Sequence, residues 1–264
     1  MTCLSWDWLV TGKETTCSPR IRKLWLSFWR RVTFVLLIVG SASLVVACTG
    51  PGPITSATID GRVVVGGGHA LVSPATLDLV NGTTAVVVKA RSLGGALYRV
   101  STPPGSGIRP LVSLVGRTVE VALTGYGAKT GVPTIDIAVA SGVHWTINLD
   151  GGATTEDIDM SGGRLTSLNF DSGVSMASVR LPAAVGTERV TLAGGASVLA
   201  VEAPAGAPAQ IDAQGGASEV QFDGVSHTGV AAGSVFTEPG FAGAENRYAI
   251  TLTAGVSDFR MVRT

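Results

Sequence analysis

Four short phrases decide the fold: INLDGG at 147–152, LNFDSG at 168–173, VTLAGG at 190–195 and IDAQGG at 211–216. They begin 21, 22 and 21 residues apart. Each phrase alternates apolar and polar residues and then reaches glycine. Alternation with a period of two is the signal of a β-strand, and glycine tolerates the backbone conformations of tight corners. The phrases therefore predict a repeating unit of about 21 residues, in which a strand is followed by a corner.

A second series of apolar-polar-apolar triplets lies between these phrases. Because side chains alternate across a strand, the flanking residues of each triplet are expected to point inward and the central residue outward. Two strands per unit predict an all-β, single-stack β-solenoid with rungs of about 21 residues. In this stack Asn148 should lie against Asn169, and Asp159 beside Arg180. The central residues of the second series are Asp159, Arg180, Ala200 and Gln221.

The regions on either side of the phrases are less regular. Residues 54–140 are expected to form either irregular rungs of the same stack or a β cap over its end. Arg247–Met261 should close the stack, and 224–246 is expected to be an excursion that covers an edge, with a binding loop as the alternative. The strands expected in the first region are Ile59–Val65, Leu77–Val80, Ala85–Ala90, Ala96–Val100, Leu111–Val115, Thr118–Thr124 and Thr134–Ala140.

The N-terminal segment carries an address. Arg30 and Arg31 precede an uncharged run, 32–47, that ends in Val45-Val46-Ala47-Cys48. The run is shorter than the roughly 20 residues of a membrane-spanning helix and is typical of the apolar region of an export signal. Its end resembles the lipobox of bacterial lipoproteins, although Val45 stands where leucine is commonest. An uncleaved N-terminal anchor is the alternative.

The lipobox resemblance implies that Cys48 receives lipid, that the chain is cut just before it, and that the protein is held on the extracytoplasmic face of the cell membrane. Several acyl chains on one residue give stable anchoring. The expected organisation is a 1–47 N-terminal extension with a signal or anchor helix, a 48–53 tether, a 54–140 irregular β region or cap, and a 141–264 regular β-solenoid.

Charge and cysteine content exclude several classes of site. Of 19 basic and 19 acidic residues, 1–47 hold 6 and 2, which leaves 13 and 17 and a net charge of −4 after cleavage. Such a body has no basic patch for nucleic acid. All three cysteines lie at or before Cys48, so the body has no disulfide and no thiolate metal site. No cofactor is expected.

The glycine-rich phrases resemble a family of envelope proteins. LDGGA, MSGGRL, LAGGASV, AQGGASEV and the closing RYAITLTAGVSDFRM, within 140–264, are similar to the β-solenoid tails of cell-wall-stress-response membrane proteins and to head domains of auto-transporter adhesins. The resemblance implies a non-catalytic envelope role in scaffolding, sensing or adhesion, with a protein or glycan partner. It brings no catalytic residues.

The alternative function is that of a β-helix enzyme that binds or cleaves glycans, with acids among Glu156, Asp157, Asp159 and Asp171. Paired carboxylates at a suitable separation catalyse glycoside hydrolysis. Against this, Asp159 should face Arg180 and not another acid. The three histidines, His69, His144 and His227, are scattered singly, so no metal site is expected. On the non-catalytic interpretation, the residues that matter most are corner glycines such as Gly195 and inward residues such as Leu192 and Phe170.

Overall fold

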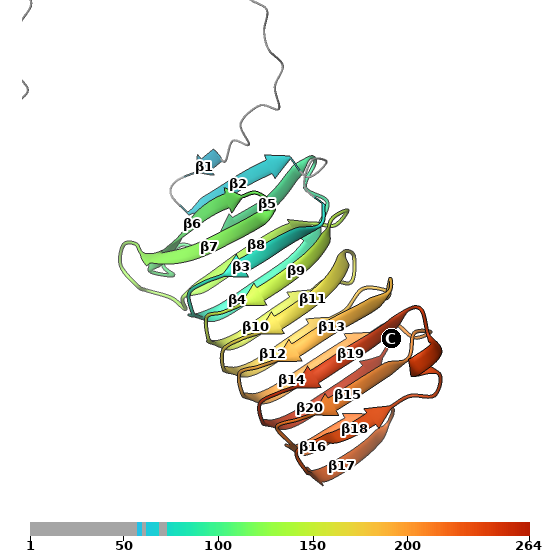
Figure 1. The fold of residues 1–264 in the computed structure, drawn as a ribbon. Helices are drawn as coiled ribbons and strands as arrows, with labels where there is room; N and C mark the ends of the chain where they lie inside the picture. The colour runs from blue at the N-terminus through green and yellow to red at the C-terminus, as the bar shows by residue number, and fades with distance from the viewer. Residues whose placement is uncertain (1–56, 60–61, 69–72) are drawn as a thin grey trace, which may run out of the picture. The chain divides into compact units, whose positions relative to one another are not determined.

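The computed structural model describes residues 57–59, 62–68 and 73–264. These residues form an all-β body of two large, mainly parallel sheets that do not close on one another (Figure 1). One short 3-10 turn, η2 (Phe241–Gly243), interrupts the strands near the C-terminal end. The prediction of an all-β body is confirmed.

The first sheet, sheet A, has eleven strands. Its seven central strands, β8 to β16 in spatial order, are parallel, and antiparallel strands complete both ends. In spatial order the strands are β1 (Ala57–Ile59), β2 (Val63–Gly68), β5 (Ala96–Ser101), β8 (Thr134–Ala140), β4 (Thr83–Arg91), β10 (Ala153–Asp159), β12 (Val174–Arg180), β14 (Ala196–Ala203), β20 (Val256–Arg263), β16 (Ala217–Phe222) and β17 (Val225–Val230).

The second sheet, sheet B, has nine strands. We call a strand of sheet B, the corner after it and the next strand of sheet A a rung; β9–β10 is one example. In spatial order the strands of sheet B are β6 (Ile108–Val115), β7 (Thr118–Gly125), β3 (Ala75–Leu79), β9 (His144–Leu149), β11 (Arg164–Phe170), β13 (Thr187–Leu192), β19 (Arg247–Leu252), β15 (Ala209–Ala213) and β18 (Ser234–Thr237).

The predicted register holds in the middle of the body. Asn148 pairs with Asn169 across β9 and β11, and Asp159 pairs with Arg180 across β10 and β12. Both predictions of the 21-residue rung are confirmed at these strands. The next step is different, because β12 and β14 pair with an offset of 22 residues. Arg180 therefore lies opposite Glu202, and not opposite Ala200 as the triplet series suggests.

The order of the rungs departs from the order of the chain at both ends. The C-terminal rung β19–β20 does not close the stack, as the sequence suggests, but lies between β13–β14 and β15–β16. In the same way β3–β4 lies between β7–β8 and β9–β10. Figure 1 shows the red strands β19 and β20 inserted beside paler orange ones. Each inserted rung has a parallel partner on both sides in both sheets.

Antiparallel strands cover the two ends of the stack. The excursion expected at 224–246 forms β17 against β16 and β18 against β15, which confirms that it covers an edge. At the other end β6 pairs with β7, and β5 and β2 follow β8. The single strand expected at Ile59–Val65 is wrong, because the chain reverses and Ile59 pairs with Val63. An Asp60-Gly61 dipeptide, typical of a tight turn, stands between them.

The core is one continuous apolar layer between the sheets. In every triplet of the two series, both flanking residues are buried and the central residue is not, as the pleat requires. Large side chains fill the layer, and the indole Nε1 of the buried Trp145 donates a hydrogen bond to the carbonyl of Ala140 at 2.9 Å. Removing this much apolar surface from water is the main source of stability in such a stack.

The corners explain the repeated glycine. A Cβ on Gly151 or Gly194 would lie well inside 3.0 Å of the backbone of the preceding rung, which is Asn81 or Ser172 respectively. Side chains are therefore sterically excluded at these two positions. Gly195, which the sequence singles out, is less constrained, because a Cβ there would meet the carbonyl oxygen of Gly255 at 3.5 Å, an ordinary contact. The critical corner residue is Gly194 instead.

Candidate functional site

The predicted lipid site lies outside the described residues. Cys48, the export signal 1–47 and the tether 48–53 all fall in this part of the chain, so lipid attachment remains a prediction. Within the residues that the structure does describe, no helix has the length and apolar character to cross a membrane.

Two of the candidate acids lie on the outer face of sheet A and are paired with cations. Asp157 lies 3.3 Å from the Lys89 ammonium, and Asp159 lies 3.9 Å from the Arg180 guanidinium. Hydrogen bonds from Ser161 and the charge of Arg180 hold the pKa of Asp159 below its usual value. The predicted cross-rung ion pair is confirmed. Ionised, neutralised carboxylates of this kind form a solvated charge ladder, and they are not arranged as an acid and a nucleophile.

Glu156 points in the opposite direction, into the core. It is 4% exposed, its Oε2 has no hydrogen-bond partner, and burial raises its pKa to about 8. Glu188 in β13 is similar, with 2% exposure, an unpartnered Oε2 and a pKa raised by burial to about 8. A glycan at the surface cannot reach either carboxyl, so the placement of Glu156 argues against the catalytic role considered for it.

The last candidate acid, Asp171, has a neighbour that the sequence analysis missed. Asp150 and Asp171 follow β9 and β11 at the same corner, one rung apart, and the hydroxyl of Ser172 donates to the Asp150 carbonyl. Burial, followed by a hydrogen bond and charge repulsion from Asp171, raises the pKa of Asp150. Their separation of 21 residues in the sequence equals the rung length and would have revealed the pair. Carboxyls in mutual hydrogen-bond contact are too close for the acid and nucleophile of a glycosidase, which stand about 5 Å or more apart.

The histidines lie apart. His144 begins β9, and the ring of His227 in β17 packs 4.7 Å from that of Phe236 in β18, while His69 falls outside the described residues. Across the described part of the chain, no group of three or more histidine, cysteine, aspartate or glutamate side chains is placed to hold a metal ion.

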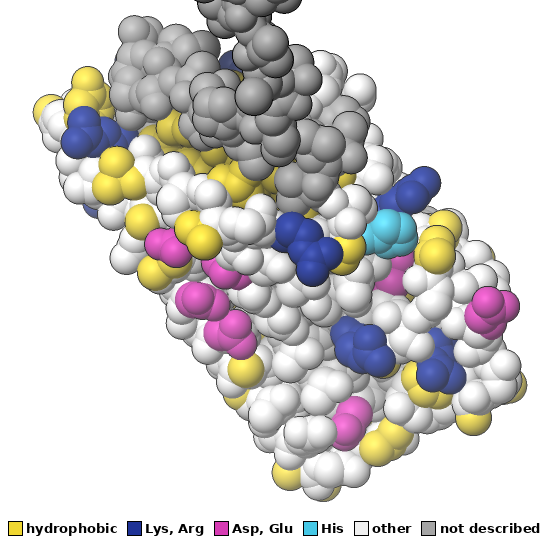
Figure 2. Space-filling model, turned by 45° about the horizontal axis from the view of Figure 1, so that its top comes forward, with side chains coloured by type: hydrophobic (Ala, Val, Ile, Leu, Met, Phe, Trp, Pro, Cys, Tyr) yellow, Lys and Arg dark blue, Asp and Glu magenta, His cyan; other side chains and the backbone are white. Residues whose placement is uncertain are grey.

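The outer face of sheet B carries a row of hydrogen-bonded amides and acids. Asn169 Nδ2 donates to Asn148 Oδ1 at 2.7 Å, and Asn148 Nδ2 donates to Asp78 Oδ1 at 2.7 Å. Thr191 continues the row opposite Asn169. On the face shown in Figure 2, charged side chains of both signs are scattered over a surface that is mainly uncharged and polar. Such a surface suits contact with a polar partner more than catalysis.

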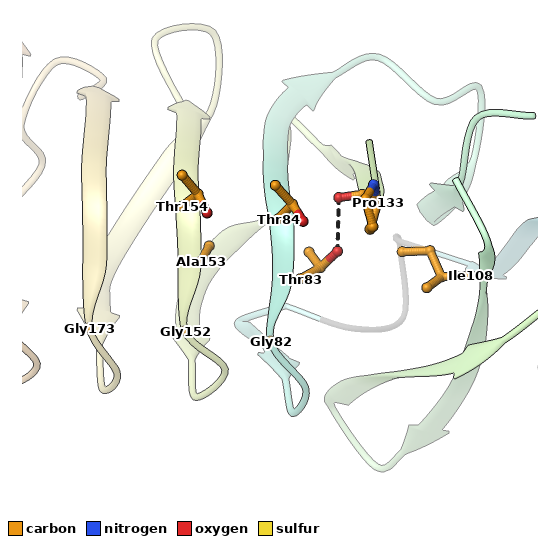
Figure 3. Close-up of a pocket in the computed structure, with 9 residues that line it drawn as sticks. All are labelled: Gly82, Thr83, Thr84, Ile108, Pro133, Gly152, Ala153, Thr154 and Gly173. Atoms are coloured by element: carbon orange, nitrogen blue, oxygen red, sulfur yellow. Dashed lines mark hydrogen bonds between the residues drawn. The ribbon is translucent and has the colours of Figure 1, made fainter. Parts of the chain in front are cut away.

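A shallow groove of about 550 Å³ runs along the corners where sheet A begins (Figure 3). Glycines of successive rungs form much of it, and the Thr83 hydroxyl in it already donates to the Pro133 carbonyl at 3.0 Å. The groove contains no charged side chain. Its lining is Gly82, Thr83, Thr84, Ile108, Pro133, Gly152, Ala153, Thr154 and Gly173. Glycine is present here because neighbouring corners approach closely, and the groove has no chemistry of its own.

The comparisons with known proteins bear on the fold. No protein-family model and no curated protein sequence matches the chain. Among solved structures, it is similar to one described as "a putative cell adhesion protein" from Clostridium sporogenes, with 16% identity and a TM-score of 0.56, over 77% of this chain and 98% of that one. This likeness shows a shared fold. A second structure, "a putative adhesin" from Bacteroides fragilis, is 7% identical over 76% of this chain and 97% of that one, but its TM-score of 0.20 carries no argument.

Proposed function

We propose that the protein is a non-catalytic adhesion module of the bacterial envelope, with a β-solenoid body held at the extracytoplasmic face of the cell membrane by lipid on Cys48. The observation that carries the proposal is the pairing of parallel rungs at a regular offset, which gives a rigid body with two broad, polar outer faces. The fold shared with the Clostridium sporogenes protein, whose description names cell adhesion, supports it. Solenoid faces of this kind serve as extended binding surfaces.

The placement of the candidate acids favours adhesion over the alternative of a glycan-cleaving enzyme. Asp157 and Asp159 are paired with Lys89 and Arg180, and Glu156 lies in the core. A glycosidase needs two accessible carboxyls on either side of a bound sugar. Polar and charged side chains on a flat, rigid sheet can instead make many weak contacts, which become strong when many copies act together.

The tether is tested by labelling cells with palmitate. The wild-type chain should take up label and fractionate with membranes. Cys48→Ala should take up none and accumulate as a larger, unprocessed precursor, because the thiol that accepts the lipid is missing. Label on the Cys48→Ala chain, or a labelled wild-type chain that is not shortened, would contradict the lipoprotein interpretation.

Adhesion is tested by comparing the attachment of cells that carry the wild-type chain, the Cys48→Ala chain or no chain to glycan-coated and protein-coated surfaces. We expect attachment only with the tethered chain. Release of reducing sugar from a polysaccharide by the purified chain, lost in Asp157→Asn without loss of folding, would support the enzyme alternative instead.

A further inference from the structure

A hollow of about 230 Å³ on the outer face of sheet A has the charge pattern of a binding site. It lies where β5, β8 and β4 run side by side. Ala138 of β8 pairs with Arg99 of β5 on one side and with Lys89 of β4 on the other. A methyl group between two long cationic side chains leaves the floor low and the walls high.

The walls carry unused hydrogen-bond donors. Lys89 is shared with Asp157, at 3.3 Å, but Arg91 and Arg99 are exposed and make no ion pair or hydrogen bond with any residue that the structure describes. In contrast, Arg180 further along the same face binds Glu202 at 3.0 Å. A guanidinium presents a planar fork of donors that matches a carboxylate. The two free forks at this hollow are therefore suited to an anionic group.

The floor offers acceptors beside these donors. Asp136 and Ser101 are directly opposed on β8 and β5, and both line the hollow. Burial raises the pKa of Asp136, and the charge of Lys89 opposes this effect. A carboxylate and a hydroxyl next to the cations accept hydrogen bonds from hydroxyl groups. A compact inorganic anion would place its charge against Asp136, whereas a sugar acid would place hydroxyls there.

We propose that the hollow binds one unit of an acidic glycan, with the carboxylate of a uronic acid on Arg91 and Arg99 and ring hydroxyls on Asp136 and Ser101. Its volume is below the 300–1,000 Å³ of drug-sized pockets, which fits a single sugar unit of a polymer. The proposal rests on the proposed adhesion function and names the class of ligand for it. One such site binds weakly, so the polymer would be held by many copies of the protein on one cell.

The test is calorimetric titration of the purified full chain with a tri-uronate oligosaccharide at low salt. Arg99→Gln is expected to weaken binding by about tenfold or more, because it removes a charge-assisted hydrogen bond. Arg189→Gln is the matched control, since Arg189 is an exposed arginine on the opposite sheet without an ion pair among the described residues, and it should leave binding unchanged. Binding should also weaken as salt is added.

Asp136→Asn separates the two possible sources of affinity. For a bound sugar acid, this change should weaken the tri-uronate by severalfold, since an amide is a poorer acceptor for hydroxyls than a carboxylate. For inorganic phosphate, the same change should improve binding, because a negative charge is removed. A tri-uronate that behaves as phosphate does, a neutral trisaccharide that binds equally well, equal losses in Arg99→Gln and Arg189→Gln, or no binding at all would each overturn the proposal.

The outcome is independent of whether the protein is an adhesin. Cells that attach through the tethered wild-type chain and also through an Arg99→Gln chain would keep the adhesion function and remove this site from it. Loss of attachment with Arg99→Gln alone, at unchanged surface amount, would support both.

Discussion

The two buried glutamates should make the stability of this protein fall as the pH rises. Burial raises the pKa of Glu156 from 4.5 to about 8 in the folded chain. Below pH 4.5 both the folded and unfolded chains hold the proton, and between pH 4.5 and about 8 only the folded chain does. The unfolded state binds fewer protons across this window, so the free energy of unfolding decreases with pH and levels off above it.

The magnitude follows from the size of the shift. Each pKa unit corresponds to about 1.4 kcal/mol, so a rise from 4.5 to about 8 sets an upper limit of about 5 kcal/mol for Glu156. Glu188, with the same pKa, adds a similar amount. Water penetration and relaxation around a charged carboxyl reduce such figures. We therefore expect at least about 2 kcal/mol per glutamate between pH 5 and 9.

The perturbation is Glu156→Gln, which keeps the shape of the side chain and removes its titration. At pH 5 the variant should be equal to the wild type or less stable by about 1–3 kcal/mol, since a buried amide also needs partners. At pH 9 it should be the more stable of the two. Urea unfolding at both pH values, extrapolated linearly to zero urea, measures the difference. Glu202→Gln is the control, because Glu202 titrates at the surface beside Arg180.

Three results would separate the explanations. The double variant Glu156→Gln with Glu188→Gln should lose most of the pH dependence in this window. A Glu156→Gln chain with the same pH slope as the wild type would refute the argument that its carboxyl is protonated in the fold. A slope that disappears in Glu202→Gln instead would assign the effect to surface charge.

Further predictions concern the corners, the core and the surface. Gly194→Ala should destabilise the fold by about 1–3 kcal/mol or more, because its Cβ would overlap the backbone of Ser172, whereas Gly195→Ala should be tolerated; thermal unfolding compares them. Phe170→Ala, at a fully buried site, should cost about 3–5 kcal/mol by urea unfolding. Asp157→Asn should change stability by at most about 1 kcal/mol, since its ion pair with Lys89 is exposed; a larger loss would show that the surface ladder is structural.

Local features of the fold are predictable from the sequence because they repeat. The strand and corner of INLDGG specify which residues face inward, and the same pattern specifies LNFDSG one rung away. Two further copies of the phrase, LDLVNG at 77–82 and ITLTAG at 250–255, belong to the inserted rungs. Their spacing does not follow the 21-residue beat, so a search for a regular period passes over them. The buried glutamates break the pattern outright and could not be predicted from it.

The order of rungs is not predictable in the same way, because the rungs are nearly interchangeable. Each of the phrases buries the same two apolar positions and offers the same backbone ladder, so any of them fits beside any other. The choice depends on the connections between strands. After β15–β16, a tight turn at the positive-φ residue Asp223 sends β17 back antiparallel to β16, and β18 then covers β15. The chain that emerges has no open outer edge left to extend in parallel.

The inserted rungs solve the edge problem that a parallel stack creates. An exposed parallel strand is a template for pairing with another molecule, and short antiparallel strands reduce this hazard. Here β17 and the four-residue β18 form one end, and β6 with β1 and β2 form the other. Because the caps are made before the C-terminal rung along the chain, β19–β20 must enter the stack from within, between β14 and β16. The terminal segment is thereby held on both sides in both sheets, so the chain ends inside the body and the surface left for partners is the pair of polar faces.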